Sequence, residues 1–126
     1  MNPWDILTAA RDHLAAVPGV QTCRIGLEAG MTPDDYPMVR IVPSRAVPSG
    51  IMSRRKVEAL IYFGQPVHEF EAGLEEQWRS LLELEAALLV AVEQIPGVAA
   101  TYRETITDED RVEAYKLFAL RVELVG

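Results

Sequence analysis

The chain has 126 residues, of which 49% are hydrophobic and 25% charged, so it is large and apolar enough to form one domain, residues 1–126, with its own core. Its net charge of −7 argues against binding nucleic acid through phosphate neutralisation, although DNA could pass nearby without being held. The single cysteine, Cys23, excludes an internal disulfide, which fits a reducing cytosol. The first residues do not resemble a secretory signal, and the apolar run 86–92 is too short to cross a bilayer. We therefore expect a soluble, cytoplasmic protein.

The N-terminal segment predicts a helix. Asn2 is a capping residue, Pro3 suits the first helical position, and Asp5 favours the positive end of the helix dipole. The residues expected on its apolar face are Trp4, Leu7, Ala10, Leu14 and Val17. The Pro18-Gly19 pair ends the helix.

Three strands are predicted next, at residues 20–27, 37–42 and 56–63, because each is short and rich in β-branched or alternating apolar residues. Residues 28–36 have loop composition. Residues 43–55 contain two prolines, a glycine and three serines, and predict a long loop. We expect residues 44–55 to be mobile in the free protein and to become ordered against a partner.

A long helix is predicted at residues 74–95, ended by Pro96-Gly97. Its expected core stripe is Leu74, Trp78, Leu81, Leu88, Val92 and Ile95. Near residues 86–92 the helix is apolar almost all round, which predicts that two sides are covered, one of them by a neighbouring molecule. Strands at 98–107 and 112–125 follow, around the acidic turn 108–110. The order αβββαββ predicts an α+β fold: a mainly antiparallel sheet of about five strands with two helices on one face.

No catalytic or metal-binding motif is present in the sequence. His13 and His68 are far apart, and Cys23 has no partner cysteine, so the usual spacing of metal ligands is missing. Cys23 lies in a predicted strand, where a small buried side chain is its expected role. Nucleophile-elbow, dinucleotide-binding and phosphate-loop patterns are also missing. The sequence therefore predicts no enzyme activity and no cofactor.

Charge is segregated along the chain. Residues 40–56 carry five basic side chains and no acid, whereas residues 69–93 carry seven glutamates and only Arg79. Such a separation can be simple solvation, or it can align the basic loop of one copy with an acidic surface of another copy. Head-to-tail contacts of this kind can close into a ring. The proposed interface residues, with a subunit or a tail tube as the other side, are Arg45, Arg54, Arg55, Lys56, Glu75 and Glu76.

The organisation of the whole chain resembles the tail terminator proteins of long-tailed phages, including the Mu-like group. The features that carry the resemblance are the leading helix ending in Val17-Pro18-Gly19-Val20, the hairpin with its 43–55 loop, the helix 74–95 and the closing strand pair. The resemblance implies a homo-oligomer, specifically a hexameric ring, that caps the tail tube, ends its elongation and presents a surface to the head–tail connector protein. It also implies a location in the virion, after assembly in the host cytoplasm, with DNA passing through the ring.

Other classes of protein fit the same features. A different head–tail connector or completion protein has a similar size and layout. A small ligand-binding α+β module would need an apolar pocket with convergent polar groups. A small enzyme working at a subunit interface would use Tyr62, His68 or Glu69 in a shared site.

Overall fold

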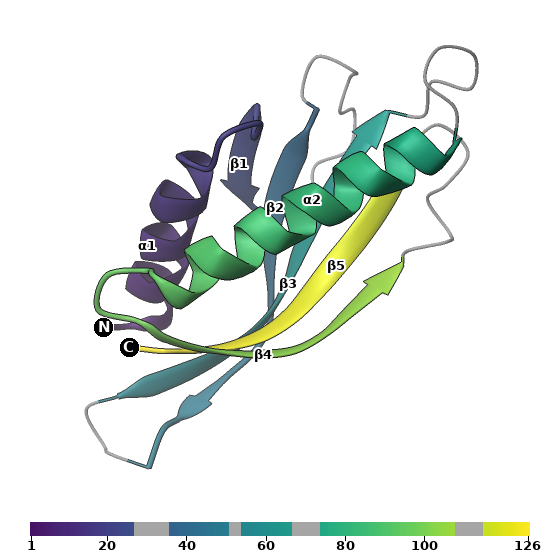
Figure 1. Ribbon diagram of the computed structural model, residues 1–126. Coiled ribbons are helices and arrows are strands. Elements are labelled where there is room, and N and C mark those ends of the chain that lie inside the picture. Colours follow the sequence, from purple (N-terminus) through teal and green to yellow (C-terminus); the bar gives the residue numbers. More distant parts are fainter. Residues whose placement is uncertain (27–35, 51–53, 67–73, 108–114) are drawn as a thin grey trace.

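The computed structural model describes residues 1–26, 36–50, 54–66 and 74–107, together with 115–126. Its elements in chain order are α1 (Pro3–Ala15), β1 (Thr22–Ile25), β2 (Met38–Pro48), β3 (Arg55–Pro66), α2 (Leu74–Glu93), β4 (Ala99–Thr107) and β5 (Tyr115–Val125). The predicted α+β class and the order αβββαββ are therefore confirmed. Both helices lie on the same side of the sheet, with the long α2 crossing it obliquely (Figure 1).

The five strands form one sheet in the order β1-β2-β3-β5-β4. β1 is parallel to β2, and every other neighbouring pair is antiparallel. Because β5 lies between β3 and β4, the chain crosses the sheet through α2 before β4 forms an edge. β1 pairs only with residues 38–41 of β2. The rest of β2 therefore has no strand partner on the β1 side.

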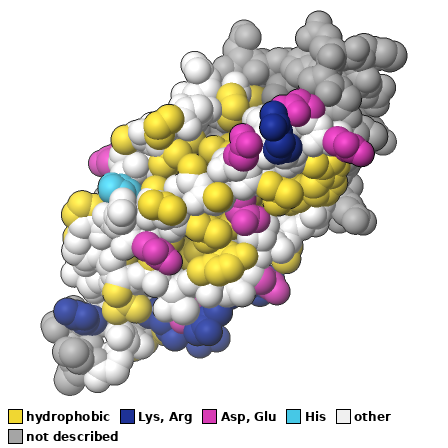
Figure 2. All heavy atoms as spheres, viewed as in Figure 1, with side chains coloured by type: hydrophobic (Ala, Val, Ile, Leu, Met, Phe, Trp, Pro, Cys, Tyr) yellow, Lys and Arg dark blue, Asp and Glu magenta, His cyan; other side chains and the backbone are white. Residues whose placement is uncertain are grey.

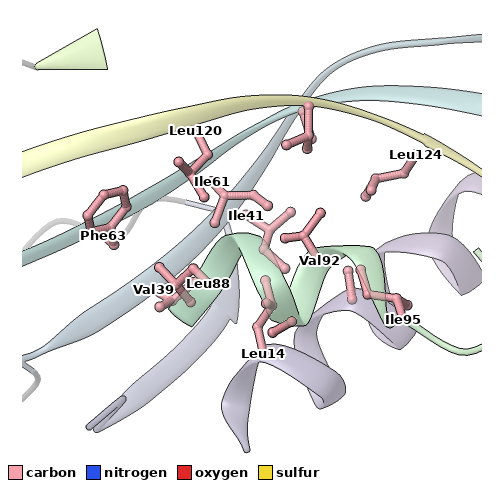
Figure 3. Close-up of a cluster of buried hydrophobic side chains, with 14 of the residues drawn as sticks. Leu14, Val39, Ile41, Ile61, Phe63, Leu88, Val92, Ile95, Leu120 and Leu124 are labelled. Atoms are coloured by element: carbon pink, nitrogen blue, oxygen red, sulfur yellow. The ribbon is translucent and has the colours of Figure 1, made fainter. Parts of the chain in front are cut away.

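The core lies between the two helices and one face of the sheet. Side chains alternate along each strand, so every second residue of β2, β3 and β5 points at the helices. Leu88 and Leu14, from different helices, are both fully buried in this layer together with Ile61. Figure 3 shows these side chains converging between α2, α1 and the sheet.

The start of α1 follows its sequence signal closely. The Asn2 side chain accepts a hydrogen bond from the Asp5 backbone N–H at 2.8 Å, and the Asp5 side chain accepts one from the Asn2 backbone N–H at 3.3 Å. This reciprocal capping box satisfies N–H groups that have no partner within the helix. At the other end, Gly19 has a φ of 91°, a left-handed conformation that glycine adopts without a Cβ penalty.

Two predictions about the helical faces are wrong in part. Trp4 was expected in the core, but 59% of it is exposed, and Ile6 takes the buried position instead. Trp78 was also expected against the sheet, but it is 37% exposed; its ring packs on that of Phe118 in a T-shaped arrangement with the centroids 5.2 Å apart. Leu81, Leu88, Val92 and Ile95 are buried as predicted.

The prediction of a long loop at residues 43–55 is also wrong. β2 runs to Pro48 and β3 starts at Arg55, with paired residues from Met38↔Gly64 to Pro48↔Arg55 and a bulge near Ser44. The segment between the strands is therefore only 49–54, of which 51–53 lie outside the described residues. The outer part of this hairpin projects beyond the body of the domain (Figure 1).

Candidate assembly surfaces

The first candidate surface is the outer part of the β2–β3 hairpin, called the arm here and comprising residues 43–50 and 54–58. Residues 56–58 still pair with β5, and Val57 is buried in the core, so only the distal end of the arm projects. Its bases Arg45 and Arg54 are exposed, whereas Arg55 and Lys56 are half-buried. The arm also presents apolar groups to solvent, including Ala46 and Pro48. It is therefore both basic and partly apolar.

Internal contacts neutralise only part of the charge on the arm. Arg45 lies 3.7 Å from Glu58, and Lys56 lies 4.0 Å from Glu123. The main chain of Arg55 is tied to Gly126 by two backbone hydrogen bonds of 3.1 and 3.2 Å. Among the described residues, Arg54 and Arg55 have no carboxylate partner; Arg54 is exposed, whereas the Nε of Arg55 is buried without a hydrogen bond.

The predicted acidic partners lie in the first turn of α2. Glu75 and Glu76 are exposed, and Glu76 accepts a hydrogen bond from Arg79 one turn further along the helix. Glu75 has no basic partner among the described residues. Acidic groups at a helix N-terminus are favoured by the helix dipole, so the position of these two glutamates has a local explanation.

The structure keeps the two groups of proposed interface residues apart. The arm lies at one end of the molecule, and the N-terminal half of α2 lies at the other end (Figure 1). Figure 2 shows Lys and Arg side chains gathered at the arm end of the helix-bearing face, while acidic side chains lie along α2. The six residues therefore form two surfaces of opposite charge rather than one site within a single chain.

The second face of the sheet, which the helices do not cover, carries a charged network. Arg103 donates to Glu123 at 2.8 Å, and Arg121 lies 3.1 Å from Glu104. The hydrogen bond from Arg103 is the main reason that the pKa of Glu123 lies below its usual value. Beside this network is a hollow of about 170 Å³, which is smaller than the roughly 300–1,000 Å³ typical of small-molecule pockets. The residues that line it are Ser44, Glu58, Leu60, Arg103, Arg121, Val122 and Glu123.

Cys23 lies in β1 and packs against the main core. Burial raises the pKa of its thiol to about 11, although the nearby Arg40 acts in the opposite direction. The thiol is therefore protonated at neutral pH, unlike an activated nucleophile.

Of the remaining candidates from the sequence, the structure describes Tyr62 and His13, and these two lie on different elements. Tyr62 is half-buried beside Tyr36 and Met38 on the second face of the sheet, while His13 is in the last turn of α1. His68 and Glu69 lie outside the described residues. Within the part of the chain that the structure describes, no cluster of three potential metal ligands occurs. No described helix is long and apolar enough to cross a membrane.

Sequence reasoning missed the buried Arg40. This side chain on β2 is 1% exposed, and its Nη1 donates to Thr22 Oγ1 at 2.9 Å and to the Val39 carbonyl at 3.0 Å. Its Nε is buried and makes no hydrogen bond. Arg40 therefore belongs to the interior, and its charge does not add to the basic surface that the sequence predicts for residues 40–56.

Comparison of the chain with models of known families, and with curated proteins, finds no match.

Proposed function

We propose that the protein is a structural subunit that assembles with copies of itself into a ring, and that this ring caps a phage tail tube. In this proposal the ring ends tube elongation and offers the tail-side surface for joining to the head. The observation that carries the proposal is the placement of two complementary surfaces at opposite ends of one chain. Contacts between unlike surfaces generate closed rings when the rotation between neighbours closes, and open filaments when it does not.

The charge balance supports a structural role around DNA rather than a DNA-gripping role. The chain carries 19 acidic and 12 basic residues. On the second face of the sheet, the described cations Arg103 and Arg121 are each paired with glutamate. A surface whose bases are already paired offers little net attraction to phosphate, so DNA would pass such a ring without being retained.

A different head–tail connector protein would use the same two surfaces, so the experiment must separate the two roles. Fluorescently labelled protein is added to the tail tube protein of the same phage during tube polymerisation, and electron microscopy records tube lengths and label positions. A terminator is expected at one end of the tubes and shortens their length distribution as its concentration rises. Label that is absent from tube ends, with unchanged tube lengths, would overturn the terminator proposal. Binding to purified connector under those conditions would then favour a connector role.

A further inference from the structure

The outer face of α2 carries a stripe of apolar side chains that are exposed or partly exposed. Leu82 is 49% exposed and Val90 is 56% exposed, and the exposed Ala86 lies between them. Together with Trp78 these residues recur every four positions, so they line up along one side of the helix. This stripe is distinct from the core side of α2, where Leu81, Leu84 and Leu88 are buried.

A shallow, open hollow of about 560 Å³ lies over the N-terminal half of this stripe and is called the α2 hollow here. Trp78 and Leu82 supply most of its apolar surface. Glu75 and Glu83 also line it, about two helical turns apart, with Arg79 between them, so carboxylates outnumber the single cation at its rim. The full set of lining residues is Glu75, Trp78, Arg79, Leu82, Glu83 and Ala86.

The occupant of this hollow must combine apolar groups with positive charge, because the hollow is apolar with carboxylates at its rim. The arm has this combination. Arg45 and Arg54 are exposed on the face of the arm that also carries the half-buried Val47, whereas the exposed Ala46 and Pro48 lie on its opposite face. The arm and the α2 hollow lie at opposite ends of the protomer, so an arm can reach such a hollow only on another molecule (Figure 1).

Pairing of strand edges between copies is a less suitable contact. On β2, Pro43 and Pro48 lack backbone N–H donors. On the β4 edge, the pairing shifts between Tyr102 and Glu104, and Arg103 and Glu104 add charges there. Bulges, charges and prolines are features that discourage edge-to-edge strand addition. The β2 and β4 edges therefore favour a contact between copies that uses side-chain surfaces.

We propose that the arm of one copy of this chain docks in the α2 hollow of a second copy, with Arg54 and Arg45 facing Glu75 and Glu83. This junction rests on the proposed assembly function and specifies which surfaces carry it. Each chain contributes an arm to one neighbour and a hollow to the other. The contact is therefore head to tail, as a ring of identical subunits requires.

Two variants test each side of the junction on the purified full chain. The double substitution Arg45→Glu with Arg54→Glu reverses the charge of the arm, and its control, Arg11→Glu with Arg24→Glu, makes the same change in net charge on α1 and β1, away from the arm. Leu82→Arg places a cation in the hollow, and its control, Ala87→Arg, changes an exposed position of the same helix outside the stripe. Each test variant should raise the protein concentration needed for half-assembly by about tenfold or more. Each control should stay near wild type, and circular dichroism should report a normal fold for all four.

Mixing the two assembly-defective variants identifies the direction of the contact. The arm variant retains a normal hollow and the Leu82→Arg variant retains a normal arm, so a mixture can form one junction and then stop. Sedimentation velocity is expected to show a heterodimer in the mixture and monomers of each variant alone. Wild-type assembly by folded test variants, or a mixture that remains monomeric at all accessible concentrations, would overturn the junction. These measurements need no tail tube, so they can fail or succeed independently of the terminator proposal.

Discussion

Leu88→Ala should strongly destabilise the domain, because Leu88 lies on the side of α2 that packs in the core between the two helices and the sheet. The side chain is fully buried, and Figure 3 shows it among the side chains that fill the space between α2 and the sheet. Removing three carbon atoms costs about 2.4 kcal/mol at roughly 0.8 kcal/mol per buried methylene. The surrounding strands and α1 hold the site open, so a cavity term brings the expected loss to about 3–4 kcal/mol.

The assay is equilibrium unfolding in urea at a protein concentration where every variant is monomeric, because assembly would add its own stabilisation. With a slope of about 1.5 kcal/mol per M, the midpoint should fall by about 2 M. Leu82→Ala is the matched control, since the same atoms are removed from the same helix at a position that is 49% exposed. Its cost should be below about 1 kcal/mol. Equal midpoints for the two variants would refute the assignment of the buried side of α2.

Three further predictions concern individual residues. Asn2→Ala should cost about 1 kcal/mol of unfolding free energy through loss of the capping box, while Asn2→Ser should retain most of it; equal losses in urea would contradict this. The pKa of Cys23 is raised from 9.0 to about 11, so its stabilising contribution is complete below about pH 9 and is lost as pH rises toward 11. Wild type should therefore lose stability over that range relative to Cys23→Ala, and parallel pH profiles would argue against the burial. Arg103→Ala should raise the pKa of Glu123 toward 4.5 in an NMR titration, and no change would show that their hydrogen bond is absent in solution.

The helices were predictable because their ends carry local signals. Asn2 and Pro3 mark the start of α1, and the pairs Pro18-Gly19 and Pro96-Gly97 follow the two helices. The apolar face of α2 was harder to assign, because the polar Gln77 occupies a buried position, 8% exposed, next to the partly exposed Trp78. Hydrophobicity alone therefore assigned the tryptophan to the core. The same exposure is what makes Trp78 part of the α2 hollow.

The arm was not predictable because proline, glycine and serine usually indicate a loop. Pro43 and Pro48 instead lie in the outer part of β2, which pairs with β3 on one side and has no strand on the β1 side. Proline is tolerated on such an edge. The expectation that residues 44–55 are mobile in the free protein and become ordered against a partner stays a prediction, and it now concerns a hairpin whose residues 45–48 pair with β3. The burial of Arg40 has no local signal either, since it depends on the parallel neighbour β1 that supplies Thr22.

The central claim is that the chain assembles head to tail through the arm and the α2 hollow, and the molar mass of the wild-type protein tests it most directly. Light scattering behind size exclusion at low ionic strength should give one closed multiple of the 14.0 kDa chain, with about six copies expected from the proposed terminator role. At about 1 M salt the screening length falls to about 3 Å. The protein concentration at which half of the chains are assembled should therefore be higher than at low salt. A mass of 14.0 kDa at every salt and protein concentration would contradict the account.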